Sequence, residues 1–131
     1  MKSEMPLARH TLLEFEGCDA DLLNAPEQLK DILLEAVRRA HGTIVAELFN
    51  TFSPHGVTGV VVIAESHVAI HTWPEHGYAA VDIFSCGSKL DHATLRASLQ
   101  EALRAARVES RELVRGLSST IPPDLQSLGR S

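Results

Sequence analysis

The fold of this chain is decided by residues 57–84, which read VTGVVVIAESHVAIHTWPEHGYAAVDIF. Within the stretch, β-branched and aromatic side chains form runs typical of strands, at residues 57–64, 68–73 and 78–84. The breaks between these runs, residues 65–67 and 74–77, have the length of hairpin connections. The stretch therefore predicts neighbouring antiparallel strands.

Elements on either side of this stretch complete the predicted fold. Apolar residues at helical spacing predict a helix from Pro26 to His41, which Gly42 ends, and a second helix begins near Asp91, a favourable N-cap residue. Further strands are expected at residues 10–16, 43–52 and 108–115. The order β-α-β-β-β-β-α-β predicts an α+β fold, a two-layer sandwich of an antiparallel β-sheet with two helices packed on one face. The other face is then solvated or buried in a dimer.

Length and composition predict one domain, residues 1–131. The chain has 131 residues, of which 44% are hydrophobic, so it is long enough to bury one core and short for two. Residues 117–131 contain two prolines and several serines and are expected to form an irregular tail. Cys18 and Cys86 are too few for a disulfide framework and are expected to be free thiols.

The charge balance and the apolar pattern narrow the choice of partners. Twelve Lys and Arg against seventeen Asp and Glu give a net charge of -5, which argues against nucleic acid as a partner. The apolar stretch Val57 to Ala64 is too short to span a bilayer, and the first ten residues lack the apolar run of a signal peptide. We therefore expect a cytoplasmic protein without a membrane partner.

Histidine, cysteine, serine and acidic residues concentrate in residues 65–87, which we take as the candidate site. Alternation along a strand that begins at His67 puts His71 on the same face, and Cys86 has the parity to face a histidine across the hairpin. One interpretation is a zinc site of His67, His71, His76 and Cys86, although no typical ligand spacing supports it. A second is that these residues are structural, and a third is that His71 activates Ser66 or Cys86 as a nucleophile. Spacing alone leaves these alternatives open.

The same stretch, ESHVAIHTWPEHGYAAVDIFSCG at residues 65–87, closely resembles the signature of the small bacterial and archaeal S-adenosylmethionine decarboxylases. Similarity extends to ARHTLLEFEGCD at residues 8–19, to TIVAELFNTFSPHGVTGVVVIAESH at residues 43–67 and to VRG at residues 114–116. The resemblance covers about residues 8 to 116, far more than a short motif. It implies a two-layer α+β sandwich and a pyruvoyl-dependent carboxy-lyase.

The resemblance implies that the chain is a zymogen that cuts its own backbone between Glu65 and Ser66. The products would be residues 1–65 and 66–131, and Ser66 would become the amino-terminal pyruvoyl cofactor. His71 matches the proton acceptor of this processing reaction. Thr58 occupies a position where relatives often carry a serine that assists processing, and it keeps the hydroxyl group.

The resemblance also assigns roles in decarboxylation. The pyruvoyl group at Ser66 would form a Schiff base with the substrate amine and act as an electron sink. Cys86 matches the proton donor that quenches the carbanion. Glu75 would accept hydrogen bonds from the ribose, while Phe52 and Phe15 would stack on adenine near the sulfonium. No metal is expected.

The implied substrate is S-adenosylmethionine, and the product would be the aminopropyl donor for spermidine biosynthesis. Small members of the family pair so that sites lie at a protomer interface, which implies a homodimer or a higher even-numbered oligomer of cleaved protomers. Two alternatives remain. One is a pyruvoyl-dependent decarboxylase of arginine or ornithine, and the other is an uncleaved binding or regulatory subunit.

Overall fold

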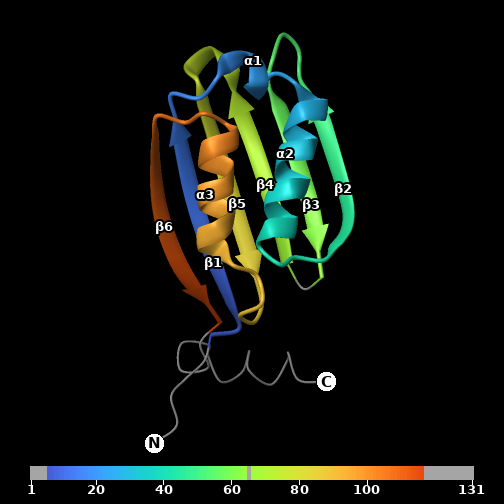
Figure 1. The fold of residues 1–131 in the computed structure, drawn as a ribbon, viewed down its shortest axis with the longest axis vertical. Coiled ribbons are helices and arrows are strands. Elements are labelled where there is room, and N and C mark those ends of the chain that lie inside the picture. Colours follow the sequence, from blue (N-terminus) through green and yellow to red (C-terminus); the bar gives the residue numbers. More distant parts are fainter. Residues whose placement is uncertain (1–5, 65, 117–131) are drawn as a thin grey trace, which may run out of the picture.

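The computed structural model describes residues 6–64 and 66–116, and it contains one six-stranded antiparallel sheet (Figure 1). The strand order is β2-β3-β4-β5-β1-β6. The elements are β1 (Ala8–Glu16), α1 (Ala20–Leu23), α2 (Pro26–Arg39), β2 (Ile44–Thr51), β3 (Val57–Ile63), β4 (Ser66–Trp73), the 3-10 turn η1 (Pro74–His76), β5 (Tyr78–Ser85), α3 (His92–Ala102) and β6 (Arg107–Arg115). This architecture confirms the predicted α+β sandwich.

Two short elements were not predicted, α1 and η1. Helix α1 is four residues long, capped by the Asp19 carboxylate, which accepts from the backbone N–H groups of Asp21 and Leu22. One turn carries no 3.6-residue periodicity, so the apolar pattern holds no signal for it. Both elements lie at the end of the sheet where β4 passes into β5 (Figure 1).

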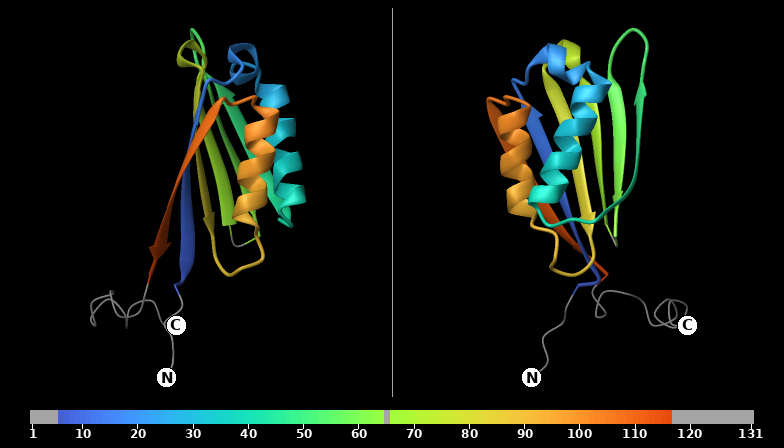
Figure 2. Two further views of the ribbon diagram at one scale, coloured as in Figure 1. Left: turned by 60° about the vertical axis from the view of Figure 1, so that its left-hand side comes forward. Right: turned by 45° about the vertical axis from the view of Figure 1, so that its right-hand side comes forward.

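Helices α2 and α3 pack side by side on one face of the sheet (Figure 2). Alternation along the central strands supplies that face with buried apolar side chains, and the helices contribute theirs at three- and four-residue spacing. The core includes Leu13, Phe15, Leu29, Leu33, Val37, Val61, Val68, Ile70, Val81, Ile83, Leu95 and Leu99. No described element covers the opposite face, which we call the open face.

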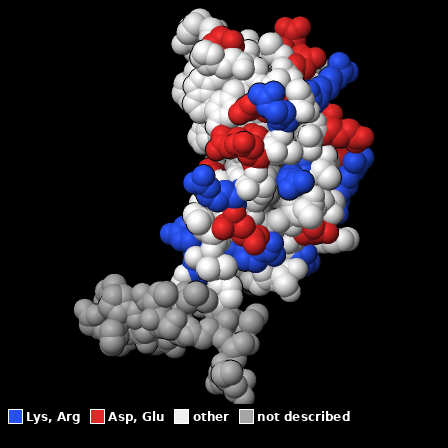
Figure 3. Space-filling view, turned by 90° about the vertical axis from the view of Figure 1, so that its left-hand side faces the viewer, with Lys and Arg blue, Asp and Glu red and all other residues white. Residues whose placement is uncertain are grey.

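Positive and negative side chains are intermixed on the surface seen from the β6 edge (Figure 3). Two ion pairs join β6 to β1 there, Arg9 with Glu112 and Arg107 with Glu16. That surface therefore presents no extended field of one sign. Among the described residues, no helix has the length and apolar character needed to cross a membrane.

Three buried polar side chains form a hydrogen-bonded cluster beneath the start of α3. Thr11 Oγ1 lies 2.7 Å from His92 Nδ1, and Ser85 Oγ lies 2.6 Å from His92 Nε2. Burial lowers the pKa of His92, and the positive charge of Arg9 lowers it further, against opposing contributions from Glu112 and Asp91. His92 is therefore a neutral imidazole in the folded protein near pH 7.

This buried imidazole predicts an acid-dependent loss of stability. Above a pH of about 6.5, His92 is neutral in both the folded and the unfolded state, and its contribution to stability is complete. At lower pH the unfolded chain binds a proton that the folded chain does not, so the free energy of unfolding falls until the lowered pKa is also passed. We expect thermal unfolding from pH 8 to pH 5 to show a shallower decline in Tm for His92→Gln than for the wild type. Equal slopes would contradict the prediction.

Candidate active site

The residues proposed for the reaction fall into two groups at opposite ends of the sheet. The first group contains Ser66 and Cys86, which line one pocket of about 170 Å³ near the end of α2. Ser66 is the first residue of β4, and Cys86 directly follows Ser85, the last residue of β5. Ser66 and Ser85 are register partners, so the antiparallel pairing of the two strands brings the Ser66 and Cys86 positions together.

The two side chains of this pocket differ in what they offer chemically. Ser66 is half-buried and carries a hydroxyl, whereas the Cys86 thiol is exposed. The second cysteine, Cys18, is buried, and burial raises its pKa to about 11. Cys86 is therefore the accessible thiol of the described chain, and it lies beside a hydroxyl at a strand terminus.

The second group contains Phe52, Thr58, His71 and Glu75, which line a pocket of about 290 Å³ at the other end of the sheet. Thr58 and His71 are register partners on β3 and β4, and Thr58 Oγ1 is hydrogen-bonded to His71 Nδ1 at 3.2 Å. Phe52 follows β2 and is 53% exposed, so one of its faces is free for a planar ligand. The pocket thus combines an imidazole, a hydroxyl, a carboxylate and an aromatic ring.

Within one chain, the two groups are too far apart to act together. His71 lies five positions after Ser66 along β4, which corresponds to about 16 Å at roughly 3.3 Å per residue, and the two side chains point to opposite faces. The expectation that Cys86 faces a histidine across the hairpin was wrong. His71 is opposite Ala80, His67 is opposite Phe84, and Cys86 lies beyond the last register pair of β4 and β5.

The structure also contradicts the expected contact between Phe15 and adenine. Phe15 is 0% exposed and belongs to the core on the helix-covered side of the sheet. Alternation along β1 explains this placement, because Leu13 and Phe15 share the inward face while Glu14 points to the open face. Phe15 is a core residue, and we remove it from the candidate site.

A protein-family model described as S-adenosylmethionine decarboxylase matches residues 9–116. The chain belongs to the S-adenosylmethionine decarboxylase family. It is similar to the S-adenosylmethionine decarboxylase proenzyme of Pelotomaculum thermopropionicum, with 48% identity over 111 residues that cover 85% of this chain and 88% of the relative. The proenzyme of Acidithiobacillus ferrooxidans is 46% identical over 110 residues, which cover 84% of this chain and 83% of that relative.

A solved structure agrees with this assignment. The crystal structure of the adenosylmethionine decarboxylase from Aquifex aeolicus matches with a TM-score of 0.80 and 34% identity, covering 88% of this chain and 96% of the other. Two predicted features lie outside the described residues, the cleavage point at Glu65 and the tail at residues 117–131.

The four residues considered for zinc do not converge, since within the described ranges no three His, Cys, Asp or Glu side chains lie close enough to hold a metal ion.

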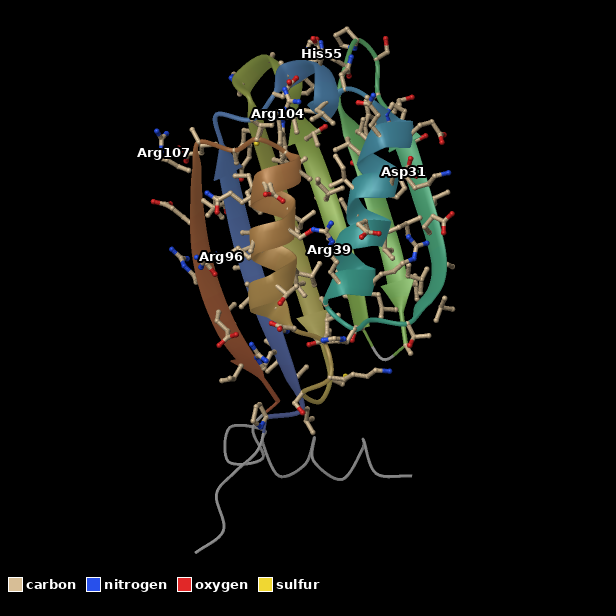
Figure 4. The ribbon with its side chains drawn as sticks, viewed as in Figure 1. Asp31, Arg39, His55, Arg96, Arg104 and Arg107 are labelled. Carbon is tan, nitrogen blue, oxygen red and sulfur yellow. The ribbon has the colours of Figure 1, made fainter. Side chains whose placement is uncertain are left out.

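His55, a residue not predicted from the sequence, also lines the second pocket. Its Nε2 lies 3.0 Å from Glu75 Oε1, and both residues lie at the η1 end of the sheet, where Figure 4 labels His55. A backbone hydrogen bond within Glu75 lowers the pKa of that carboxyl most, and the charge and hydrogen bond of His55 lower it further. His55 belongs to the Ser-Pro-His-Gly segment that connects β2 to β3. Its position directly after Phe52 was the available signal.

Proposed function

We propose that this chain cleaves itself between Glu65 and Ser66 and then decarboxylates S-adenosylmethionine. The observation that carries the proposal is the pocket shared by Ser66 and Cys86, one residue suited to form the cofactor and the other suited to donate a proton. Membership of the family supplies the reaction class, and the relatives named as proenzymes support processing. The product would be the aminopropyl donor used in spermidine synthesis.

Processing begins with the Ser66 hydroxyl, which attacks the carbonyl carbon of Glu65. A C–O bond forms, the C–N bond breaks, and the peptide becomes an ester with a free amine on residue 66. His71 of a second protomer then removes the α-proton of Ser66, the ester eliminates as the Glu65 carboxylate, and the remaining dehydroalanine reacts with water to give a pyruvoyl group and ammonia. Thr58 holds the His71 ring through the hydrogen bond at Nδ1, which leaves Nε2 free to accept the proton.

The position of residue 66 fits a pyruvoyl group. It is the first residue of a strand, it is half-buried, and the thiol of Cys86 lines the same pocket. Once formed, the group supplies a carbonyl that serves as an electron sink for decarboxylation. Cys86 holds a proton for delivery to the former α-carbon, because a positioned thiol can act as a general acid toward a developing carbanion.

Substrate recognition falls to the other pocket. Glu75 accepts hydrogen bonds from the ribose hydroxyls, and the exposed ring of Phe52 stacks on adenine. Aromatic faces nearby also favour the sulfonium cation. These contacts have no purpose for arginine or ornithine, which carry neither ribose nor adenine.

The separation of the two pockets implies a site shared between two protomers. The open face carries exposed apolar side chains from β2, β3, β4 and β6, including Leu48, Val62, Trp73 and Leu113. In a face-to-face homodimer, a two-fold axis that lies between the sheets and runs across the strands brings the Ser66 end of one sheet to the His71 end of the other. Each dimer then contains two complete sites.

Mixed dimers test this shared site directly. Ser66→Ala and His71→Ala each remove one of the two groups that every processing site needs, so each variant alone is expected to remain uncleaved. When the two are co-expressed, mixed dimers contain one site with an intact Ser66 and an intact His71, and only the His71→Ala chains can be cut. Denaturing mass spectrometry distinguishes the two chains by mass. Failure of His71→Ala to be cut in the mixture would show that each site is built within one chain.

Substrate preference tests the proposed activity. We expect the wild-type protein to release labelled carbon dioxide from S-adenosylmethionine far faster than from arginine or ornithine. Glu75→Gln replaces a charged acceptor with a neutral amide and should lower kcat/KM by about tenfold while processing continues. Phe52→Ala should act in the same direction, and Glu27→Gln, an exposed acid on α2, is the matched control. Preference for a basic amino acid would exclude S-adenosylmethionine as the substrate, and an uncleaved, inactive wild type would favour a binding subunit.

A further inference from the structure

The buried cluster of Thr11, Ser85 and His92 has no role in the mechanism given above. It joins three elements, because Thr11 lies on β1, Ser85 ends β5 and His92 begins α3. All three residues are buried, and both ring nitrogens of His92 are occupied by hydroxyl groups. A neutral imidazole in this position both donates and accepts, so each of its nitrogens is satisfied.

The cluster lies immediately next to the proposed catalytic residues. Ser85 is the register partner of Ser66, and both side chains point to the helix-covered face of the sheet. Residues directly opposite one another on the same face have Cβ atoms about 4.5–5.5 Å apart. Ser85 also precedes Cys86 in the chain, so a hydrogen bond that holds Ser85 constrains both members of the first pocket.

Neighbouring charges surround the cluster without replacing its hydrogen bonds. Arg9 is opposite Ser85 on β1, and its Nη2 lies 2.7 Å from Glu112 Oε2 on β6. Asp91 is occupied as the N-cap of α3, where it accepts from the backbone N–H of Thr94. His92 is thus the one side chain hydrogen-bonded to Ser85 among the described residues.

We propose that His92 is a positioning residue for the reaction. Through its Nε2 hydrogen bond, it holds Ser85 so that Ser66 and Cys86 keep their relative placement at the ends of β4 and β5. This inference rests on the proposed function, since it assigns His92 a purpose in self-cleavage and in the approach of the Cys86 thiol. His92 itself does not touch the reacting atoms.

Two conservative variants separate positioning from a general structural role. His92→Gln places an amide near the original Nε2 and keeps a partner for Ser85, whereas His92→Asn places its amide near Nδ1 and keeps a partner for Thr11. Each variant loses one buried hydrogen bond, so the two should lower Tm by similar amounts. Only the asparagine variant releases Ser85.

The first readout is the rate of self-cleavage after cell-free synthesis, followed by denaturing mass spectrometry. We expect His92→Gln to cleave within about twofold of the wild-type rate and His92→Asn to cleave about tenfold or more slowly, because small displacements of reacting groups cost large factors in rate. If His92→Asn does not fold, Ser85→Ala removes the hydrogen bond at Nε2 and Thr11→Val removes the one at Nδ1. Of these two variants, Ser85→Ala is expected to cleave itself more slowly.

The second readout is independent of the cofactor. In a Ser66→Ala background, the alkylation rate of Cys86 by iodoacetamide reports its surroundings, because Cys18 is buried with a pKa of about 11. The asparagine variant should change this rate by about threefold or more, and the glutamine variant should not. Equal behaviour of the two variants in cleavage and in alkylation would overturn the inference. A wild-type chain that stays whole would instead overturn the proposed function, and the alkylation comparison alone then decides the role of His92.

Discussion

Replacing Ser66 with alanine is expected to leave the purified protein as a single chain without decarboxylase activity. The hydroxyl is the only group at residue 66 that can attack the Glu65 carbonyl, and alanine offers no oxygen for the acyl shift. Without cleavage no pyruvoyl carbonyl exists, so the electron sink is missing and decarboxylation cannot proceed. The effect should be complete, in contrast to the graded losses expected at binding residues.

Denaturing mass spectrometry measures this outcome directly. The wild type should yield two chains, residues 1–65 and residues 66–131 with a pyruvoyl group at the start of the second, which blocks Edman degradation. Ser98→Ala, on α3 and away from the first pocket, is the matched serine control and should be cut normally. A single intact wild-type chain with full activity would refute pyruvoyl chemistry.

Replacing Cys86 with alanine should separate processing from catalysis. Cleavage needs the Ser66 hydroxyl and the His71 base, so the variant is expected to yield both chains, at least in part. Decarboxylation should fall by about 10²- to 10⁴-fold, the usual range for the loss of a positioned proton donor. The measurement is kcat per cleaved site with S-adenosylmethionine, since incomplete processing would otherwise appear as a loss of turnover.

The second cysteine provides the control for this experiment. Cys18 is buried, and its pKa is raised to about 11, so it is not a proton donor to an exposed site. Cys18→Ala removes a buried small side chain and should lower Tm while leaving turnover per cleaved site unchanged. Near-normal turnover by fully cleaved Cys86→Ala would exclude Cys86 from the mechanism.

The positions of the long elements were predictable because their signals are local. Runs of β-branched and aromatic side chains predicted β3, β4 and β5, and apolar spacing with Pro26 predicted α2, each within a few residues of its observed bounds. The short gaps also predicted antiparallel neighbours, which the register of β3, β4 and β5 confirms. The four residues of α1 escaped this approach because one helical turn has no repeat to detect.

The sequence identified the candidate residues, because the segments that match the family are long and specific. It did not show which of these residues lie close together in the folded chain. Ser66 and His71 are only five positions apart in the sequence, which suggests that they act together within one chain. Strand β4 instead places them about 16 Å apart and on opposite faces of the sheet. Ser66 and Cys86, twenty positions apart in the chain, share a pocket because β4 and β5 run antiparallel. Distance along the chain is therefore a poor guide to distance in space. Residues at two ends of one strand lie far apart, whereas residues on paired strands lie close together.

The sequence by itself determined the strands, the two long helices and the family, and it supplied the candidate residues for the chemistry. Only the tertiary structure decided that Phe15 is buried, that His55 pairs with Glu75, and that His92 bridges Thr11 and Ser85. The physical reason is that secondary structure follows from periodicities of two and 3.6 residues, which neighbouring residues carry. Burial and hydrogen-bond partnership depend instead on contacts between segments distant in the chain, and Thr11 meets His92 only after β1, β5 and α3 have packed.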